Sequence, residues 1–229
     1  AADRRKRAPS PLEPQTSVLM ILRIIIQPTK MSALITRTQV TPVKDVRNGI
    51  ISFRLMSSRY QLLILNADIL KTVLQTAHDL RVPYVVCWAS KNEEELIRSG
   101  IDSLLPLAQE TGVGILLKTS GIFADTALLR RFLESYACDE LGALWDMHHP
   151  YRDFGESADA TIKNLGTYVR HVHLRDSDDA DTYNLIGEGS LPVADMMRAL
   201  SSINYDGFIS LEWKPEWMED LQDREIIFP

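Results

Sequence analysis

The chain has 229 residues, 45% hydrophobic and 24% charged, a composition that excludes disorder throughout and is ordinary for a globular protein. Only two cysteines, Cys87 and Cys138, are present, which excludes a disulfide framework and favours a reducing, cytoplasmic location. The longest apolar run, 18–26, has nine residues and contains Arg23, far below the roughly 20 that a membrane span needs. We therefore expect no membrane association.

The net charge of −6 is unevenly distributed, which predicts a boundary near residue 60. Residues 1–60 hold eleven Lys or Arg against three acids, whereas 61–229 hold fourteen against twenty-eight. The basic segment has some features of a secretory leader, a transit peptide or a nucleic-acid arm, but a basic tail with a few irregular strands explains it more simply. We therefore predict an irregular segment over 1–60, with candidate strands at 18–26, 33–40 and 49–55, and a regular region over 61–229.

Helical and strand patterns alternate from about residue 69 onward. Val73, Leu74 and Ala77 have helical spacing, and Asn92 with Glu95 forms a capping-box pattern. The expected helices are 69–80, 92–110, 125–136, 158–165 and 190–203, and the expected strands are 82–89, 113–119, 141–147, 169–175 and 208–213.

The spacing of these strands indicates a parallel sheet. Their centres lie 28 to 39 residues apart, and strand–helix alternation at this period means parallel strands joined by right-handed crossovers. An eight-stranded (β/α) barrel and an open doubly wound sheet both fit the pattern. No glycine-rich phosphate-binding motif follows any strand, which argues against the nucleotide-binding folds of this class.

Polar residues stand at the end of each of the last four strands: Lys118 to Ser120, Asp146 to His149, His173 to Asp176, and Glu212. Because parallel strands present their carboxyl ends on one face, we expect Lys118, Asp146, His173 and Glu212 to lie within about 8 Å of a common point. His171 lies nearer the middle of its strand and is expected to be a core residue.

An Asp, a His and a Glu on adjacent strands suit a divalent cation such as Mn²⁺, Mg²⁺, Co²⁺ or Zn²⁺. Such a cation can bind neighbouring substrate oxygens and stabilise an enediolate while a carboxylate moves the proton. The competing interpretation makes the histidines core residues and Asp146 a helix cap. We favour function, because clusters at strand ends are the usual site in this architecture.

Four segments in this order resemble the xylose-isomerase-like sugar phosphate isomerase/epimerase barrels, a superfamily that includes tagatose and psicose epimerases and endonuclease IV. They are residues 144–150 (LWDMHHP), 171–176 (HVHLRD), 187–189 (GEG) and 205–213 (YDGFISLEW). The resemblance covers about 70–218 and implies a TIM-type barrel. It implies that Asp146, His173 and Glu212 are metal ligands, that Glu212 is also an acid/base catalyst, and that His149, Arg175 and Glu188 contact the sugar or sugar-phosphate substrate.

The sequence departs from the family pattern in two places. Lys118 and Ser120 stand where the family has a glutamate and usually a histidine, and that glutamate is both the fourth metal ligand and the second acid/base group. A protonated lysine cannot bind a metal and repels it. The second departure is that only six residues separate candidate strands 18–26 and 33–40, too few for a parallel crossover. The first half of the barrel is therefore either missing or rebuilt.

Three functions remain open. The leading one is a metal-dependent isomerase or epimerase impaired by Lys118. The second is a Schiff-base lyase of the aldolase type with Lys118 as the nucleophile. The third is a non-catalytic barrel in which the Lys118 ammonium replaces the cation. Endonuclease activity is least favoured, because residues 61–229 carry a net charge of −14 and would repel nucleic acid. If residues 1–60 leave the edge at 82–89 exposed, that edge favours a homodimer.

Overall fold

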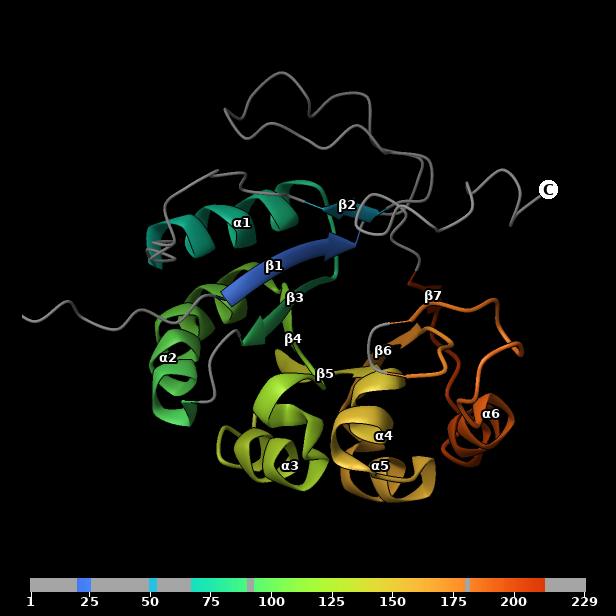
Figure 1. Ribbon diagram of the computed structural model, residues 1–229. Helices are drawn as coiled ribbons and strands as arrows, with labels where there is room; N and C mark the ends of the chain where they lie inside the picture. The colour runs from blue at the N-terminus through green and yellow to red at the C-terminus, as the bar shows by residue number, and fades with distance from the viewer. Residues whose placement is uncertain (1–19, 26–49, 53–66, 90–92, 180–181, 213–229) are drawn as a thin grey trace, which may run out of the picture.

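The computed structural model describes residues 20–25, 50–52, 67–89, 93–179 and 182–212 (Figure 1). Its strands are β1 (Met20–Ile25), β2 (Ile50–Ser52), β3 (Tyr84–Ala89), β4 (Gly114–Lys118), β5 (Leu141–Asp146), β6 (Val169–Leu174) and β7 (Ile209–Leu211). Its helices are α1 (Ala67–Asp79), α2 (Glu94–Thr111), the 3-10 turn η2 (Gly121–Ala124), α3 (Thr126–Glu134), α4 (His148–Phe154), α5 (Ala158–Leu165) and α6 (Val193–Ser202). The helices and strands expected from residue 69 onward are all confirmed, whereas η2 and α4 were not anticipated.

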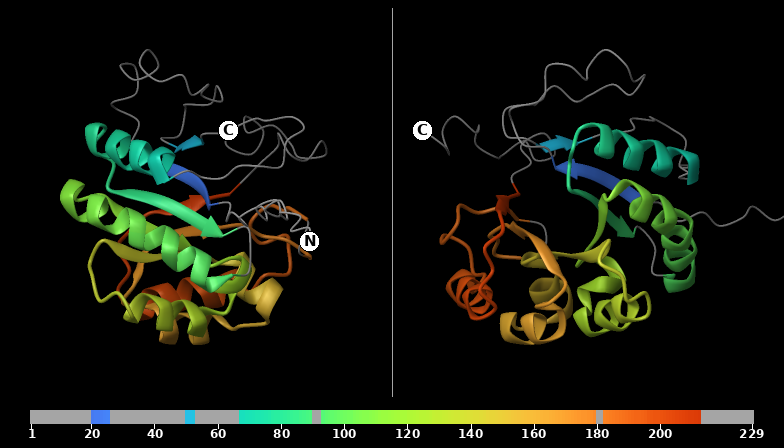
Figure 2. Two further views of the ribbon diagram at one scale, coloured as in Figure 1. Left: turned by 90° about the vertical axis from the view of Figure 1, so that its left-hand side faces the viewer. Right: turned by 180° about the vertical axis from the view of Figure 1, so that it is seen from behind.

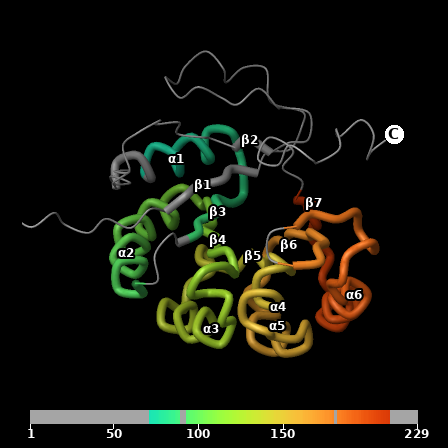
Figure 3. The backbone as a smooth tube through the Cα atoms, in the orientation of Figure 1, coloured from blue at the N-terminus to red at the C-terminus, as the bar shows by residue number. Residues whose placement is uncertain are grey.

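The described strands form one sheet in the order β2-β1-β3-β4-β5-β6-β7. Neighbouring strands from β3 to β7 are parallel, as the strand spacing predicts. The helices α2, α3, α5 and α6 lie one after another along the outer side of this curved sheet (Figures 1 and 2). The chain from β3 to β7 therefore winds as successive strand–helix units, half of a barrel rather than a doubly wound sheet (Figure 3).

Local sequence features determine where these helices begin and end. The buried face of α2 is formed by Ile97, Ile101, Leu104 and Ala108, which have helical spacing. This helix ends at Gly112, whose φ of 67° is left-handed and is readily adopted by glycine. The carboxylate of Asp125 accepts a hydrogen bond from the Leu128 amide and caps α3.

Alternating residues of the strands face opposite sides of the sheet. Towards the helices lies the main core, which includes Val85, Cys87, Ile115, Leu117, Ala143, Trp145 and Val172. The opposite side carries a second, smaller apolar cluster of Val86, Leu116 and Leu144. By the same alternation, Lys118 follows Leu116 and Asp146 follows Leu144 on the side away from the main core. The polar residues at the strand ends thus lie on the inner side of the half-barrel.

The N-terminal strands do not continue the strand–helix repeat. β1 pairs antiparallel with both β3 and β2, so the described part of 1–60 contributes antiparallel strands to the sheet instead of parallel strand–helix units. Strand candidates 18–26 and 49–55 contain β1 and β2, whereas 33–40 and the remaining irregularity predicted for 1–60 lie outside the described residues. Because β1 pairs with β3, the edge at 82–89 is not exposed, which corrects the basis of the homodimer prediction. Among the described residues, no helix is both long and apolar enough to cross a bilayer.

Candidate functional site

The four strand-end residues meet at one place. Lys118 and Asp146 end β4 and β5, His173 lies near the end of β6, and Glu212 follows β7 directly. Ligand atoms of Asp146, His173 and Glu212 all lie within 4.8 Å of one another, and all three residues are buried. The predicted convergence is therefore observed, whereas the roles of these residues remain predictions.

The ammonium of Lys118 lies among the acidic residues of this group. Its Nζ is 2.6 Å from Asp146 Oδ2 and 3.4 Å from Glu212 Oε2. Burial and the Glu212 charge would raise the pKa of the Asp146 carboxyl. The Lys118 ammonium, together with His149 and His173, outweighs both, so that this pKa lies below its ordinary value. The carboxylate form of Asp146 is thus stabilised by a positive charge that the chain itself supplies.

Backbone and hydroxyl contacts hold Asp146 in place. Its Oδ1 accepts a hydrogen bond from the His148 amide at 3.0 Å. The Thr119 hydroxyl accepts from the Asp146 amide at 2.9 Å and donates to the Asp146 carbonyl at 3.2 Å, which ties the ends of β4 and β5 together. On the other side of the site, His173 Nδ1 lies 3.9 Å from Glu212 Oε2.

A register shift in the β5–β6 pairing decides which residue faces Asp146. Ala143 pairs with Val169, but Leu144 pairs with His171, so Arg170 is an extra residue. After this irregularity Asp146 lies opposite His173, where an unbroken register would have placed Val172. His171 lies on the same side of the sheet as His173, as expected from its position two residues earlier in β6. Its Nε2 is 2.8 Å from Ser210 Oγ, which favours a structural role.

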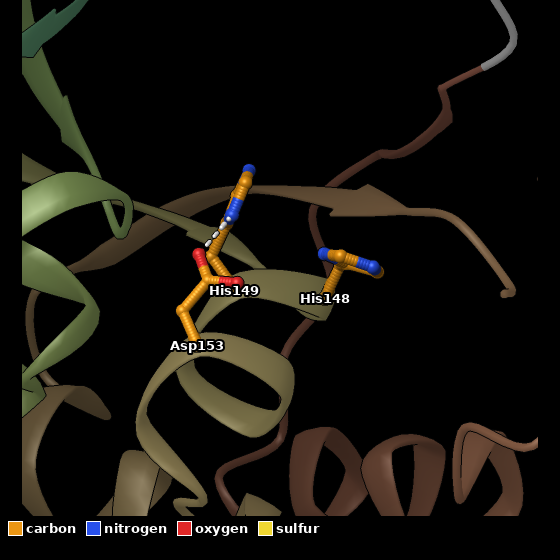
Figure 4. A group of neighbouring side chains, drawn as sticks. All are labelled: His148, His149 and Asp153. Carbon is orange, nitrogen blue, oxygen red and sulfur yellow. Dashed lines mark hydrogen bonds and ion pairs between the residues drawn. The ribbon is translucent and has the colours of Figure 1, made fainter. Parts of the chain in front are cut away.

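Helix α4 supplies a histidine at the rim of the site (Figure 4). His149 Nδ1 is 2.7 Å from Asp153 Oδ2, and its Nε2 is 3.8 Å from Asp146 Oδ2. Its side chain is 26% exposed, the largest exposure among the residues that contact Asp146 directly. His149 is therefore accessible to a solute while its orientation is determined by Asp153.

Arg175 contacts His148 and Tyr183. Its Nη2 is 2.7 Å from His148 Nδ1, and its guanidinium stacks on the Tyr183 ring at 4.4 Å. Burial, followed by the Arg175 charge, lowers the pKa of His148 to about 4. His148 is thus neutral near pH 7 and can accept the hydrogen bond from Arg175. Although His148, His149 and Asp153 form a second group with metal-ligand spacing, the guanidinium on His148 opposes a cation there.

Asp176 organises the loop that carries the Gly-Glu-Gly turn, a role that the sequence analysis missed. Its carboxylate is buried and accepts four backbone N–H bonds, from Ser177, Gly187, Gly189 and Leu191. A Cβ at Gly189 would collide with that carboxylate, which explains glycine at this position. The turn itself, Gly187-Glu188-Gly189, is visible in the sequence, but Asp176 lies eleven residues before Gly187, so no local signal connects the two. Glu188 in this turn is exposed to solvent.

The donor set alone suits a divalent cation, but the complete set of residues does not. Asp146, His173 and Glu212 are oxygen and imidazole donors close enough to share one ion. The Lys118 ammonium, however, has no lone pair to donate to a metal. It also pairs with Asp146 and Glu212, two of the three residues that would bind the ion. While Lys118 occupies this position, the site does not fit a divalent metal.

Comparison with known proteins identifies the fold and the family. The family model described as "Xylose isomerase-like TIM barrel" matches residues 55–226. The chain belongs to this family. The fold prediction of a TIM-type barrel is thereby confirmed, with the N-terminal strands rearranged as described above.

Curated relatives of this xylose isomerase-like chain include a sugar epimerase. Fructoselysine 3-epimerase from Escherichia coli O157:H7 is 25% identical over 156 residues, which cover 65% of this chain and 54% of that protein. An uncharacterised protein from Methanocaldococcus jannaschii is 28% identical over 124 residues, 51% of this chain and 42% of that protein. The chain thus spans about half the length of the curated relatives that it matches.

Solved structures with the same fold include a D-tagatose 3-epimerase-like protein, with a TM-score of 0.53 and 22% identity, covering 64% of this chain and 61% of that one. D-psicose 3-epimerase from Clostridium cellulolyticum H10, solved with D-tagatose, has a TM-score of 0.52 and 17% identity, covering 64% of this chain and 55% of that one. At these identities the likeness concerns the fold of this xylose isomerase-like chain, and its chemistry has to be argued from its own residues.

Proposed function

We propose that this chain is a sugar or sugar-phosphate isomerase or epimerase that moves a proton through an enediolate. The observation that carries the proposal is the buried group Asp146, His173 and Glu212 at the carboxyl ends of three adjacent strands. In a barrel this is the end that holds the reacting groups. Family membership and an epimerase among the relatives support the same class of reaction.

In this proposal Glu212 takes a proton from the carbon next to the sugar carbonyl. His149 contacts a sugar oxygen, which its 26% exposure and its position beside Asp146 support. Arg175 and Glu188 are the further proposed sugar contacts. Arg175 is buried against His148, and Glu188 is exposed in the turn that Asp176 holds, so both require the sugar to extend beyond the strand-end group.

A divalent cation is the cofactor that Asp146, His173 and Glu212 would hold if the Lys118 ammonium were absent. Mn²⁺, Mg²⁺, Co²⁺ and Zn²⁺ all accept such donors, and a cation there would bind substrate oxygens and neutralise charge on them. With Lys118 where the family has its second acid/base glutamate, Glu212 is the one carboxylate proposed here to move a proton. Because epimerisation needs a base on one face of the carbon and an acid on the other, we expect slow turnover.

Deuterium exchange tests the proposal directly. The full chain is incubated with D-fructose, D-psicose, D-tagatose or fructoselysine in heavy water, and exchange at the carbon beside the carbonyl is followed by NMR. We expect slow exchange with at least one ketose, lost in Glu212→Gln. The matched control is Glu134→Gln, because Glu134 is exposed on α3 and pairs with Arg130, so that variant is expected to exchange like the parent. Exchange that persists in Glu212→Gln would exclude Glu212 as the base.

A second function, sugar binding without turnover, is favoured by the Lys118 pairing itself. The Lys118 ammonium pairs with both Asp146 and Glu212, so both carboxylates are already engaged in an ion pair. The two functions separate in one experiment, because a non-catalytic barrel binds a ketose by calorimetry and shows no deuterium exchange. The Schiff-base alternative is less well supported, since the two carboxylates stabilise the charged ammonium and only the neutral amine attacks a carbonyl. Borohydride trapping of a ketose on Lys118 would instead support the Schiff-base mechanism.

The cellular setting and the oligomeric state are also proposals. Cys87 and Cys138 are both free thiols, which supports a reducing compartment such as the cytoplasm. A homodimer is the oligomer to test by light scattering, although its expected interface at 82–89 is paired with β1.

A further inference from the structure

The Lys118 ammonium has the position and the contacts of a bound cation. It extends from the end of β4, is 9% exposed, and lies 2.6 Å from Asp146 Oδ2 and 3.4 Å from Glu212 Oε2. These two carboxylates belong to the same group that has metal-ligand spacing. One charged atom of the chain therefore contacts two of the three residues that would share an ion.

The Lys118 ammonium offsets part of the negative charge of the two carboxylates. Asp146 is 1% exposed and Glu212 is 4% exposed, and two buried carboxylates this close repel each other strongly unless a positive charge lies between them. Among the described residues, the charged or titratable groups that interact with Asp146 include Lys118, Glu212, His148, His149 and His173. Lys118 supplies the largest of the favourable charge interactions, so it does electrostatically what a metal ion would do.

From this geometry we infer that Lys118 is the resident cation of the site, and that the chain holds its two buried carboxylates together without a divalent metal. The inference deepens the proposed function, because it identifies what stands in place of the metal at the same site. It does not require a sugar for its test. A divalent ion would have to displace the ammonium from Asp146 and Glu212 and remain beside its charge, so the parent protein should neither need nor gain from such an ion.

The parent protein provides the first test. The full chain is purified without chelator, analysed for metals, and melted with EDTA and with Mn²⁺. We expect substoichiometric metal, the same Tm in both conditions, and weak or undetectable Mn²⁺ binding by calorimetry. Stoichiometric bound metal, or a Tm that falls in EDTA, would overturn the inference whatever the variants do.

Removing the ammonium provides the second test. Lys118→Met retains an apolar stem but leaves two buried carboxylates without their cation, and we expect its Tm to fall by at least about 6 °C in EDTA. Mn²⁺ should restore part of this loss and bind at least about tenfold more tightly than to the parent. Lys118→Glu, which adds a fourth oxygen donor, should increase Mn²⁺ affinity by at least about tenfold as well. Equal affinities in parent and variants would mean that Lys118 does not take the place of the metal.

Two further variants separate this explanation from a general loss of packing. In Lys118→Met combined with Asp146→Asn, one of the two negative charges is removed, so the Tm should recover part of the loss and Mn²⁺ should no longer stabilise the protein. Lys163→Met is the matched control, because Lys163 is an exposed lysine of α5, and we expect parent-like melting and metal binding. A double variant no more stable than Lys118→Met would refute this electrostatic argument. Failure of the sugar experiments with these results intact would reject the proposed function alone.

Discussion

Replacing Asp176 by asparagine should release the loop that carries the Gly-Glu-Gly turn. The Asp176 carboxylate accepts N–H bonds from Gly187 at 2.8 Å and Gly189 at 3.1 Å through Oδ2, and from Ser177 at 2.8 Å and Leu191 at 3.2 Å through Oδ1. An asparagine keeps one acceptor oxygen and turns the other position into an N–H donor. Two backbone N–H groups then face a donor instead of an acceptor.

The size of the effect follows from those two bonds. A hydrogen bond to a charged group contributes about 1.5–3 kcal/mol, and the two losses are not independent, so we expect a destabilisation of about 3 kcal/mol. For a chain of this length that corresponds to a decrease in Tm of about 6–12 °C if the loss is global. If the loop opens on its own, the global stability falls less and the loop alone becomes accessible.

Two measurements together cover both outcomes. Urea unfolding of Asp176→Asn reports the global free energy, and limited chymotrypsin digestion reports cleavage at Tyr183 or Leu185 in the loop. Asp178→Asn is the matched control, because it makes the same chemical change in the same loop at an exposed residue with one side-chain bond, to Asn184. If Asp176→Asn loses less than about 0.5 kcal/mol and is cleaved like the control, the anchoring role of Asp176 is wrong.

Three further predictions concern stability and reactivity. Burial raises the pKa of the Cys87 thiol to about 12, so at pH 8 a thiol reagent should label the half-buried Cys138, with Cys87 reacting only in denaturant; labelling of Cys87 in the native protein would contradict its burial. Gly189→Ala should destabilise the chain more than Gly112→Ala, which meets no neighbouring atoms and costs about 1 kcal/mol for its left-handed φ; equal losses in urea would show that the space at Gly189 is not limiting. Asp125→Ala should cost about 1 kcal/mol by removing the cap of α3, and an unchanged unfolding midpoint would show that the hydrogen bond to Leu128 contributes nothing.

The regular part of the fold was predictable because its signals are local. A helix is recognised from apolar residues at helical spacing, such as Ile97 and Ile101 in α2. A strand is recognised from a short apolar run, such as that of β4. Both signals need only a few neighbouring residues. The alternation of strands and helices at 28 to 39 residues per step then implies parallel pairing. The same alternation places Lys118 and Asp146 on one side of the sheet, so that the composition of the site could be named before its geometry was known.

The N-terminal strands were harder to predict, because their partners are distant in sequence. The apolar run around β1 indicates a strand but contains nothing that determines its direction, which depends on the edge of β3. Helix α4 was missed because it is short, contains a proline, and begins only two residues after Asp146, where the sequence fits a loop as well as a helix. Asp176 was missed because three of its four partners, Gly187, Gly189 and Leu191, lie 11 to 15 residues away and become neighbours only when the loop folds back.

The sequence by itself determined which chemistry is present: two acids, a histidine and a lysine at the ends of four parallel strands. Only the tertiary structure decided how they meet. The register shift at Leu144 places His173 opposite Asp146. Folding of the sheet also brings Lys118 to Glu212, 94 residues away in the chain. The lysine at a ligand position was visible in the sequence, but its contact with both carboxylates was not. Such a contact depends on side chains from separate strands that share one buried volume, where a charge is stable only beside its opposite.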